Sequence, residues 1–281
     1  MAVQSLRDIE GKSPSRFSTT FDELDWLYGR TDGFWGMPEG KISLWAGIPG
    51  VGKTRLLVEI MKRLDQRRFS SMLFQGELTP AEFRGEKMPD YQVQSEIWVS
   101  QDVSIEEQIQ AIQQYKPRLV ITDSVQQIEE YGNGKGSKEI VRRLRKVLDA
   151  TRTHCVLISQ VTLGGTPRGG TTLSHEVDLD ACLKPDNLLH GIFYLSARKN
   201  RYGELREVMF QHMDWGVRCC SQGRLRDKKW LQDYRKMVMW LKANPKALAR
   251  TSLEAMYKDV PSVGDIPESG KIEKLRRWFG V

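Results

Sequence analysis

Short apolar runs alternate along the chain with longer segments that have helical periodicity. The runs have the length of β-strands and lie at 41–46, 71–74, 118–122, 155–159 and 191–197. Segments 54–64 and 137–150 instead place apolar residues three or four positions apart, so that Val141, Leu144 and Leu148 share one helix face. Strands that alternate with amphipathic helices are typical of a mainly parallel sheet flanked by helices. The pattern therefore predicts an α/β fold.

This alternation stops after about Val217. Beyond it, the periodicity predicts helices at 225–242, 246–258 and 271–279, with a turn-rich segment at 261–270. We therefore predict three regions: an N-terminal extension at 1–15, an α/β core at 16–219 and a small α-helical C-terminal region at 220–281. The sequence has no signal peptide and no run of roughly 18 uncharged apolar residues that could span a membrane. It predicts a soluble, cytoplasmic protein without a membrane partner.

Charge is distributed unevenly along the 281 residues, whose formal net charge is +7. From Arg218 to Val281 there are 15 lysines and arginines against 7 acidic residues, whereas the preceding residues hold 28 against 29. The excess of positive charge near the C-terminus favours a polyanionic partner, with Lys228 and Lys229 as candidate phosphate contacts. Alternatively, this region packs as a lid on the core and leaves its basic face in water. The four cysteines have neither zinc-site nor disulfide spacing and are expected to be free thiols.

A phosphate-binding loop is the most specific motif in the sequence. The segment Gly47-Ile-Pro-Gly-Val-Gly-Lys-Thr54 follows a predicted strand and precedes a predicted helix. Its glycines let backbone amides point at phosphate oxygens, while Lys53 reaches the terminal phosphates and the Thr54 hydroxyl binds Mg²⁺. The motif predicts ATP and Mg²⁺ as cofactors. The expected nucleotide contacts are Gly47, Pro49, Gly50, Val51, Gly52, Lys53, Thr54 and Arg55.

Three polar residues at the ends of other predicted strands complete a candidate catalytic site. Asp123 ends an apolar strand, where a carboxylate can complete the Mg²⁺ shell together with Thr54. Glu77 follows the second strand and is the candidate base for the attacking water. Gln160 ends the fourth strand and is a candidate sensor of the γ-phosphate. The alternatives are a turn-capping aspartate and an ordinary surface glutamate.

Two glycine-rich segments are candidate contacts for single-stranded DNA. One covers 161–170 and includes Arg168, and the other covers 131–136 and offers Tyr131 for stacking and Lys135 for phosphate. Plain surface loops are the alternative for both segments.

A third basic segment, Arg198-Lys-Asn-Arg-Tyr-Gly203, follows the last predicted strand. We expect it at the same sheet edge as the nucleotide but too far along the sheet to reach the γ-phosphate of its own chain. In a ring or filament such cations can serve the nucleotide of a neighbouring subunit. Lys199 and Arg201 are therefore predicted to be catalytic across a subunit interface.

Four segments give the core a specific family resemblance. They are Phe17-Ser-Thr-Thr-Phe-Asp-Glu-Leu-Asp25, Asp123-Ser-Val-Gln-Gln-Ile128, Leu173-Ser-His-Glu-Val-Asp178 and Lys199-Asn-Arg-Tyr-Gly203. Together with the phosphate-binding loop, they resemble the RecA-type ATPase core of the bacterial RadA (Sms) branch-migration helicases over residues 16–217. A more distant likeness is to DnaB-type replicative helicases.

The resemblance implies a RecA-like P-loop NTPase fold and a motor on single-stranded DNA in recombination, repair or replication. It also implies a homo-oligomer, as a hexameric ring or short filament, in a bacterial or phage-infected cell. RadA proteins carry a four-cysteine zinc module and a Lon-protease-like domain, and neither is found in this sequence; a phage or mobile-element version is the expectation. Two alternatives stay open: a recombination mediator that coats or anneals single strands, and a KaiC-like or loader-type switch whose partner is a protein.

Overall fold

A computed structural model describes residues 13–131, 137–161, 170–186, 191–214 and 216–219. The predicted C-terminal helical region and most of the predicted N-terminal extension lie outside these residues, so the division into three regions stays a prediction. Within the described part, no helix is long and apolar enough to cross a membrane.

The described core is built on one nine-stranded sheet with the strand order β13-β12-β11-β10-β5-β9-β8-β6-β7. The strands are β5 (Ile42–Gly47), β6 (Ser71–Gln75), β7 (Ile97–Ser100), β8 (Leu119–Asp123), β9 (His154–Gln160), β10 (Leu179–Pro185), β11 (Ile192–Asn200), β12 (Glu207–Met213) and β13 (Gly216–Cys219). The run from β10 to β7 is parallel throughout, whereas β11, β12 and β13 pair antiparallel. The predicted α/β fold with a mainly parallel sheet is confirmed.

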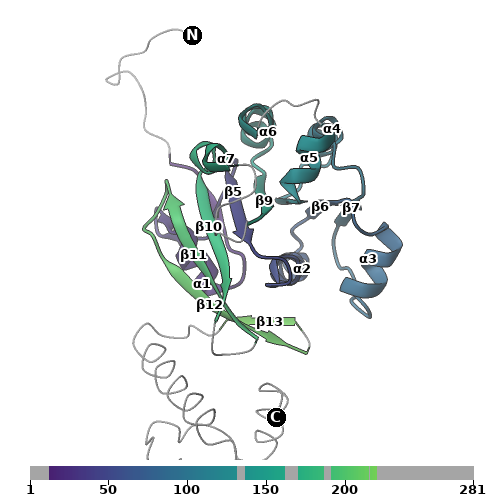
Figure 1. Cartoon of the computed structure of the whole chain (residues 1–281), viewed down its shortest axis with the longest axis horizontal. Coiled ribbons are helices and arrows are strands. Elements are labelled where there is room, and N and C mark those ends of the chain that lie inside the picture. The colour runs from purple at the N-terminus through teal and green to yellow at the C-terminus, as the bar shows by residue number, and fades with distance from the viewer. Residues whose placement is uncertain (1–12, 132–136, 162–169, 187–190, 215, 220–281) are drawn as a thin grey trace, which may run out of the picture.

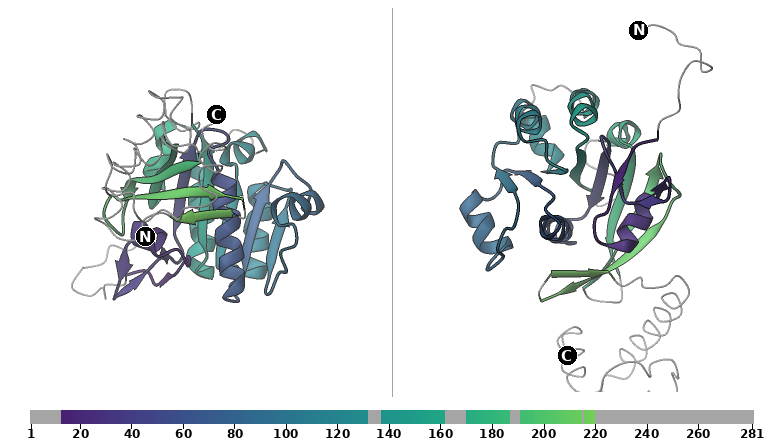
Figure 2. Two further views of the ribbon diagram at one scale, coloured as in Figure 1. Left: turned by 90° about the horizontal axis from the view of Figure 1, so that it is seen from below. Right: turned by 180° about the vertical axis from the view of Figure 1, so that it is seen from behind.

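Helices cover both faces of this sheet (Figures 1 and 2). They are α1 (Asp22–Tyr28), α2 (Lys53–Gln66), α3 (Pro80–Lys87), α4 (Ile105–Tyr115), α5 (Val125–Tyr131), α6 (Ser137–Thr151) and α7 (Gly170–Glu176). Buried side chains of α1, α2 and α3 form one apolar cluster, and those of α4, α5, α6 and α7 form a second one. The sheet separates the two clusters because alternate residues of each strand point to opposite faces. Two short pairs, β1 (Arg16–Phe17) with β4 (Met37–Pro38) and β2 (Arg30–Thr31) with β3 (Phe34–Trp35), flank α1 in sequence.

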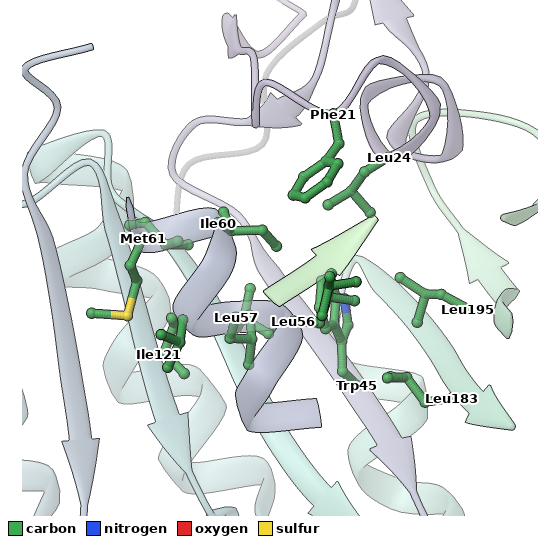
Figure 3. Close-up of a cluster of buried hydrophobic side chains, with 14 of the residues drawn as sticks. Phe21, Leu24, Trp45, Leu56, Leu57, Ile60, Met61, Ile121, Leu183 and Leu195 are labelled. Atoms are coloured by element: carbon green, nitrogen blue, oxygen red, sulfur yellow. The ribbon is translucent and has the colours of Figure 1, made fainter. Parts of the chain in front are cut away.

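Trp45 of β5 lies at the centre of the first cluster. Its side chain is fully buried and packs toward Leu56 of α2, with Leu183 of β10 and Leu195 of β11 beside it (Figure 3). The apolar residues of α2 recur at helical spacing and give this helix one buried face, made by Leu56, Leu57, Ile60, Met61 and Leu64. This packing fixes the helix that follows the phosphate-binding loop against the strand that precedes it.

Four strands of the described sheet were not predicted from the apolar pattern, namely β7, β10, β12 and β13. β7 is short, and it lies at the edge of the sheet with every residue only partly buried. β10 carries Asp180 within its apolar run, and β12 carries Gln211 and His212. These polar residues find partners or cover only after the neighbouring elements are in place, so the strands depend on tertiary pairing more than on local pattern.

His154 makes the stability of the fold dependent on pH. The ring lies buried at the start of β9, with Nε2 2.9 Å from the Ser43 hydroxyl and Nδ1 2.8 Å from the Pro38 carbonyl. Burial lowers its pKa from 6.5 to about 4, although the hydrogen bond to Pro38 opposes this shift. As the pH falls below 6.5, the His154 imidazole becomes protonated in the unfolded chain, whereas in the folded chain it stays neutral until about pH 4.

We therefore expect His154 to lower the free energy of unfolding by about 2 kcal/mol between pH 7 and pH 5. Urea unfolding at both pH values measures this effect. The variant His154→Gln should lack this part of the pH dependence, whereas His175→Gln, which replaces an exposed histidine, should keep it. The same pH dependence in the wild type and in His154→Gln would contradict the assignment.

Candidate nucleotide-binding site

The parallel strands bring Asp123 and Gln160, with Glu77 close by in sequence, to the edge of the sheet where the phosphate-binding loop begins. Gly47, at the end of β5, is level with Gln160 at the end of β9. Asp123, at the end of β8, is level with Gln75 of β6, two residues before Glu77. Because β9 lies between β5 and β8, and β6 follows β8, the four strand ends form a continuous row. Ligands of open α/β sheets bind at this carboxyl edge.

The phosphate-binding loop joins β5 to α2 in the conformation that its glycines allow. Gly50 and Gly52 have φ values of 77° and 96°, in the left-handed region that favours glycine. The buried ammonium of Lys53 donates 2.8 Å hydrogen bonds to the carbonyls of Gly47 and Ile48. Burial lowers the pKa of Lys53, and the charge of Asp123 opposes this shift. The cation is thus folded over the loop where phosphate oxygens would lie.

Thr54 and Asp123 meet although they come from different elements. The Thr54 hydroxyl, in the first turn of α2, donates a 2.7 Å hydrogen bond to Oδ2 of Asp123. Burial raises the pKa of Asp123, the hydrogen bond from Thr54 opposes the rise, and the negative charge of Glu77 adds to it. A hydroxyl and a carboxylate oxygen are hard donors, so this pair fits Mg²⁺.

Glu77 and Gln160 flank this pair. The side chain of Glu77 is exposed, while its backbone amide donates a 3.0 Å hydrogen bond to Oε1 of Gln75. Gln160 is half-buried, and the preceding Ser159 accepts a 2.9 Å hydrogen bond from the Gln126 amide. The role of Glu77 as a base for water and that of Gln160 as a sensor stay predictions.

A cavity of about 620 Å³ opens beside the phosphate-binding loop. Its wall combines the loop and α2 with the end of α3 and with β12 and β13, and includes Gly50, Lys53, Thr54, Glu59, Pro89, His212 and Asp214. This volume is typical of small-ligand sites and could hold the nucleoside part of a nucleotide.

His212 is a site residue that sequence reasoning missed. Its Nε2 lies 3.3 Å from the Val51 carbonyl, and its ring stacks on Phe193 with centroids 4.5 Å apart. A Cβ atom at Gly52 would come within 2.2 Å of the ring, so the loop needs glycine here for this close approach. The sequence gives no signal for the contact, because residue 212 lies in an unpredicted strand far along the chain from residue 52.

The basic segment at the end of β11 is not at the nucleotide edge of the sheet, and the prediction that placed it there was wrong. β11 pairs antiparallel with β10, whereas β10 is parallel to β5. Consequently Asn200 is level with Leu179 and Ser43, at the start of β5, while the phosphate-binding loop lies at the other end of that strand. The prediction failed because it took this strand to run parallel to its predecessors.

At this opposite edge, Lys199 and Arg201 contact the end of α7. Lys199 Nζ donates to the carbonyls of Ser174 and His175, at 3.0 and 2.6 Å. Arg201 donates to the His175 carbonyl at 3.2 Å and pairs with Asp178 at 3.3 Å. Their predicted role in a neighbouring site stays a prediction.

The residues predicted to contact DNA are not described. Lys135, Arg168, Lys228 and Lys229 lie outside the described residues, as does the side chain of Tyr131. Arg55, predicted to contact nucleotide, lines the cavity and donates a hydrogen bond to the Met213 carbonyl. Cys155, Cys182 and Cys219 are free thiols, as predicted.

Several known proteins have sequences similar to this chain. The chain is 27% identical over 229 residues to a protein from Haemophilus influenzae named DNA repair protein RadA, which covers 77% of this chain and 47% of the relative. It is 28% identical over 227 residues to the RadA protein of Mycolicibacterium smegmatis, with the same coverage. The chain is therefore similar to RadA proteins over about three quarters of its length. The RadA protein of Aquifex aeolicus is 27% identical over 227 residues, or 76% of this chain.

The chain spans about half the length of the RadA proteins that it matches. No family model matches the chain. The predicted resemblance to RadA is confirmed, and the RecA-like fold that it implied agrees with the strand order and with the position of the phosphate-binding loop after β5.

Proposed function

We propose that this chain is an ATP hydrolase that is stimulated by single-stranded DNA and moves along it, as a helicase or branch-migration motor in recombination, repair or replication. The observation that carries the proposal is the meeting of Lys53, Thr54 and Asp123 at the carboxyl edge of the sheet, within a RadA-type core. The names of the relatives, DNA repair protein RadA, support the DNA partner.

Each residue of the site has a distinct task in hydrolysis. Lys53 leaves the carbonyls of Gly47 and Ile48 and binds the terminal phosphates of ATP. Thr54 and Asp123 would hold Mg²⁺, which would supply positive charge to offset that of the phosphates. Glu77 orients the attacking water and accepts its proton.

Gln160 and the cavity complete this assignment. The Gln160 amide, one strand away from Asp123, senses the γ-phosphate. The cavity beside the loop, with His212 in its wall, holds the nucleoside.

The position of Arg201 supports the proposal that a second copy completes the site. This arginine and the phosphate-binding loop lie at opposite edges of one sheet, so Arg201 cannot serve its own loop without refolding. It can serve the loop of another copy in a head-to-tail arrangement, which generates a ring or a filament. We therefore propose that Lys199 and Arg201 contact the γ-phosphate of the nucleotide bound by the neighbouring copy. The active assembly would then be a hexameric ring or a short filament.

The test is an experiment that mixes two variants. One variant lacks the lysine of the phosphate-binding loop, and the other lacks the arginine proposed to act on the neighbouring copy. Lys53→Ala and Arg201→Ala should both hydrolyse ATP poorly when alone. In an equal mixture, about a quarter of interfaces join an intact phosphate-binding loop to an intact Arg201, so activity should partly return. The rate should peak at equal amounts of the two chains. A mixture that stays as inactive as its components would refute the assignment in trans.

Single-stranded DNA distinguishes the motor from its alternatives. We expect the wild-type rate of ATP hydrolysis to rise with single-stranded DNA, and the rise to weaken with salt because phosphate contacts release counterions. DNA binding without strand displacement on forked duplexes would instead indicate a mediator. A rate that single-stranded DNA leaves unchanged would contradict the proposal and favour a switch with a protein partner.

A further inference from the structure

The end of α7 is held by three cations from distant parts of the chain. Helix α7 has seven residues, and helices this short are marginal in water without outside support. Its last carbonyl groups have no partner within the helix. Lys199 and Arg201 bind the carbonyls of Ser174 and His175, and Arg145 of α6 binds that of Glu176 at 2.6 Å.

Asp178, which follows α7, links two of these cations. Its carboxylate is almost fully buried and pairs with Arg145 at 3.2 Å and Arg201 at 3.3 Å. It also accepts a 3.0 Å hydrogen bond from the Ile42 amide. If Arg201 left, Asp178 would keep Arg145 and Ile42, so no buried charge would be stranded.

Of the two arginines that pair with Asp178, Arg201 is the more exposed and is therefore the one more easily released. The Arg201 side chain is 46% exposed, against 30% for Arg145. Burial lowers the pKa of Lys199, and the adjacent positive charge of Arg201 lowers it further. Lys199 and Arg201 lie side by side, and three of their four hydrogen bonds and ion pairs named above go to neutral carbonyl groups. A phosphate carries negative charge and would accept stronger hydrogen bonds from both cations than carbonyl groups do.

We propose that Lys199 and Arg201 have two alternative sets of partners: the last carbonyls of α7 in their own chain, and the γ-phosphate of the nucleotide bound by a neighbouring copy. Nucleotide binding by one copy then loosens α7 in the next one. The inference rests on the proposed function, because it needs the neighbour.

Hydrogen–deuterium exchange with isotope labelling tests this coupling. Isotope-labelled Lys53→Ala chains, which keep Arg201 but do not bind nucleotide, are mixed with unlabelled Arg201→Ala chains, which do bind it. On addition of a slowly hydrolysed ATP analogue with Mg²⁺, the α7 amides of the labelled chain should exchange at least about tenfold faster, as expected for the loss of about 1.4 kcal/mol of hydrogen bonding. Labelled Lys53→Ala chains alone should show no change.

A matched control comes from the same strand. Arg198 precedes Lys199 and pairs with Asp180 of β10 at 2.6 Å. Adding Arg198→Ala to the labelled Lys53→Ala chain should leave the tenfold effect intact, whereas adding Arg201→Ala should make α7 exchange fast without nucleotide and abolish any further change.

The outcomes separate the two proposals. If the mixture regains ATP hydrolysis but α7 of the labelled chain is unchanged, the exchange of partners is wrong and the assignment of Arg201 in trans survives. If the mixture regains no hydrolysis, that assignment fails and this inference fails with it.

Discussion

Replacing Lys53 with alanine should reduce the rate of ATP hydrolysis by about a hundredfold or more, the size of effect seen when one preorganised charge-stabilising group is removed. Lys53 is the side chain that the structure folds over the phosphate-binding loop, held by two 2.8 Å hydrogen bonds to Gly47 and Ile48. Its ammonium is buried, so its interaction with phosphate is stronger than it would be in water. Steady-state hydrolysis by the purified full chain measures the effect.

Lys41→Ala is the matched control for this prediction. Lys41 and Lys53 flank the same strand, but Lys41 lies at the other end of β5 and pairs with the exposed carboxylate of Asp149 at 2.8 Å. A surface ion pair of this kind contributes little, so this variant should keep its rate within about twofold. Urea unfolding of both variants checks that the fold is retained. Equal losses of activity in the two variants would show that Lys53 has no special role.

Replacing Trp45 with alanine should cost about 3–5 kcal/mol of the free energy of unfolding. The indole is fully buried and fills the space between β5, α2 and the antiparallel strands (Figure 3). Alanine would leave a cavity that the surrounding leucines, fixed on separate elements, can fill only in part. Urea unfolding monitored by far-ultraviolet circular dichroism measures the loss. Because Trp45 is two residues from Gly47, ATP hydrolysis should become more heat-sensitive as well.

Trp98→Ala is the control, because it makes the same substitution at a tryptophan that is less buried than Trp45. Trp98 lies on the edge strand β7, is only partly buried and packs against the Tyr115 ring with centroids 4.9 Å apart. Its removal should cost about 1–2 kcal/mol, mainly the lost aromatic contact. A Trp45→Ala variant that is no less stable than Trp98→Ala would contradict the central position of Trp45.

Whether a residue of the candidate site could be predicted from the sequence depended on how far it lies from its partners along the chain. The phosphate-binding loop was predicted because its chemistry is local: glycines, lysine and threonine must follow one another to wrap a phosphate. Asp123, Glu77 and Gln160 were predicted because each ends or closely follows an apolar strand, and parallel strands end at a common edge. His212 was not predicted, since its contact with Val51 joins residues that no local pattern connects.

Strand direction was decided only by the tertiary structure. The Lys199-Asn-Arg-Tyr-Gly203 segment was noticed from the sequence, but its place was wrong because an apolar run carries no information on whether it pairs parallel or antiparallel. That choice depends on the length of the connection: β10 ends at Pro185 and β11 begins at Ile192, and this connection is too short for the crossover that parallel strands need.

The sequence alone therefore determined the α/β class, the phosphate-binding loop and the RadA resemblance, because each rests on residues close together or on simple periodicity. The tertiary structure decided that Arg201 lies at the opposite edge from that loop, where it caps α7 and pairs with Asp178. This position results from the antiparallel pairing of β10 with β11, and it is the physical reason for assigning Arg201 to a second copy of the chain.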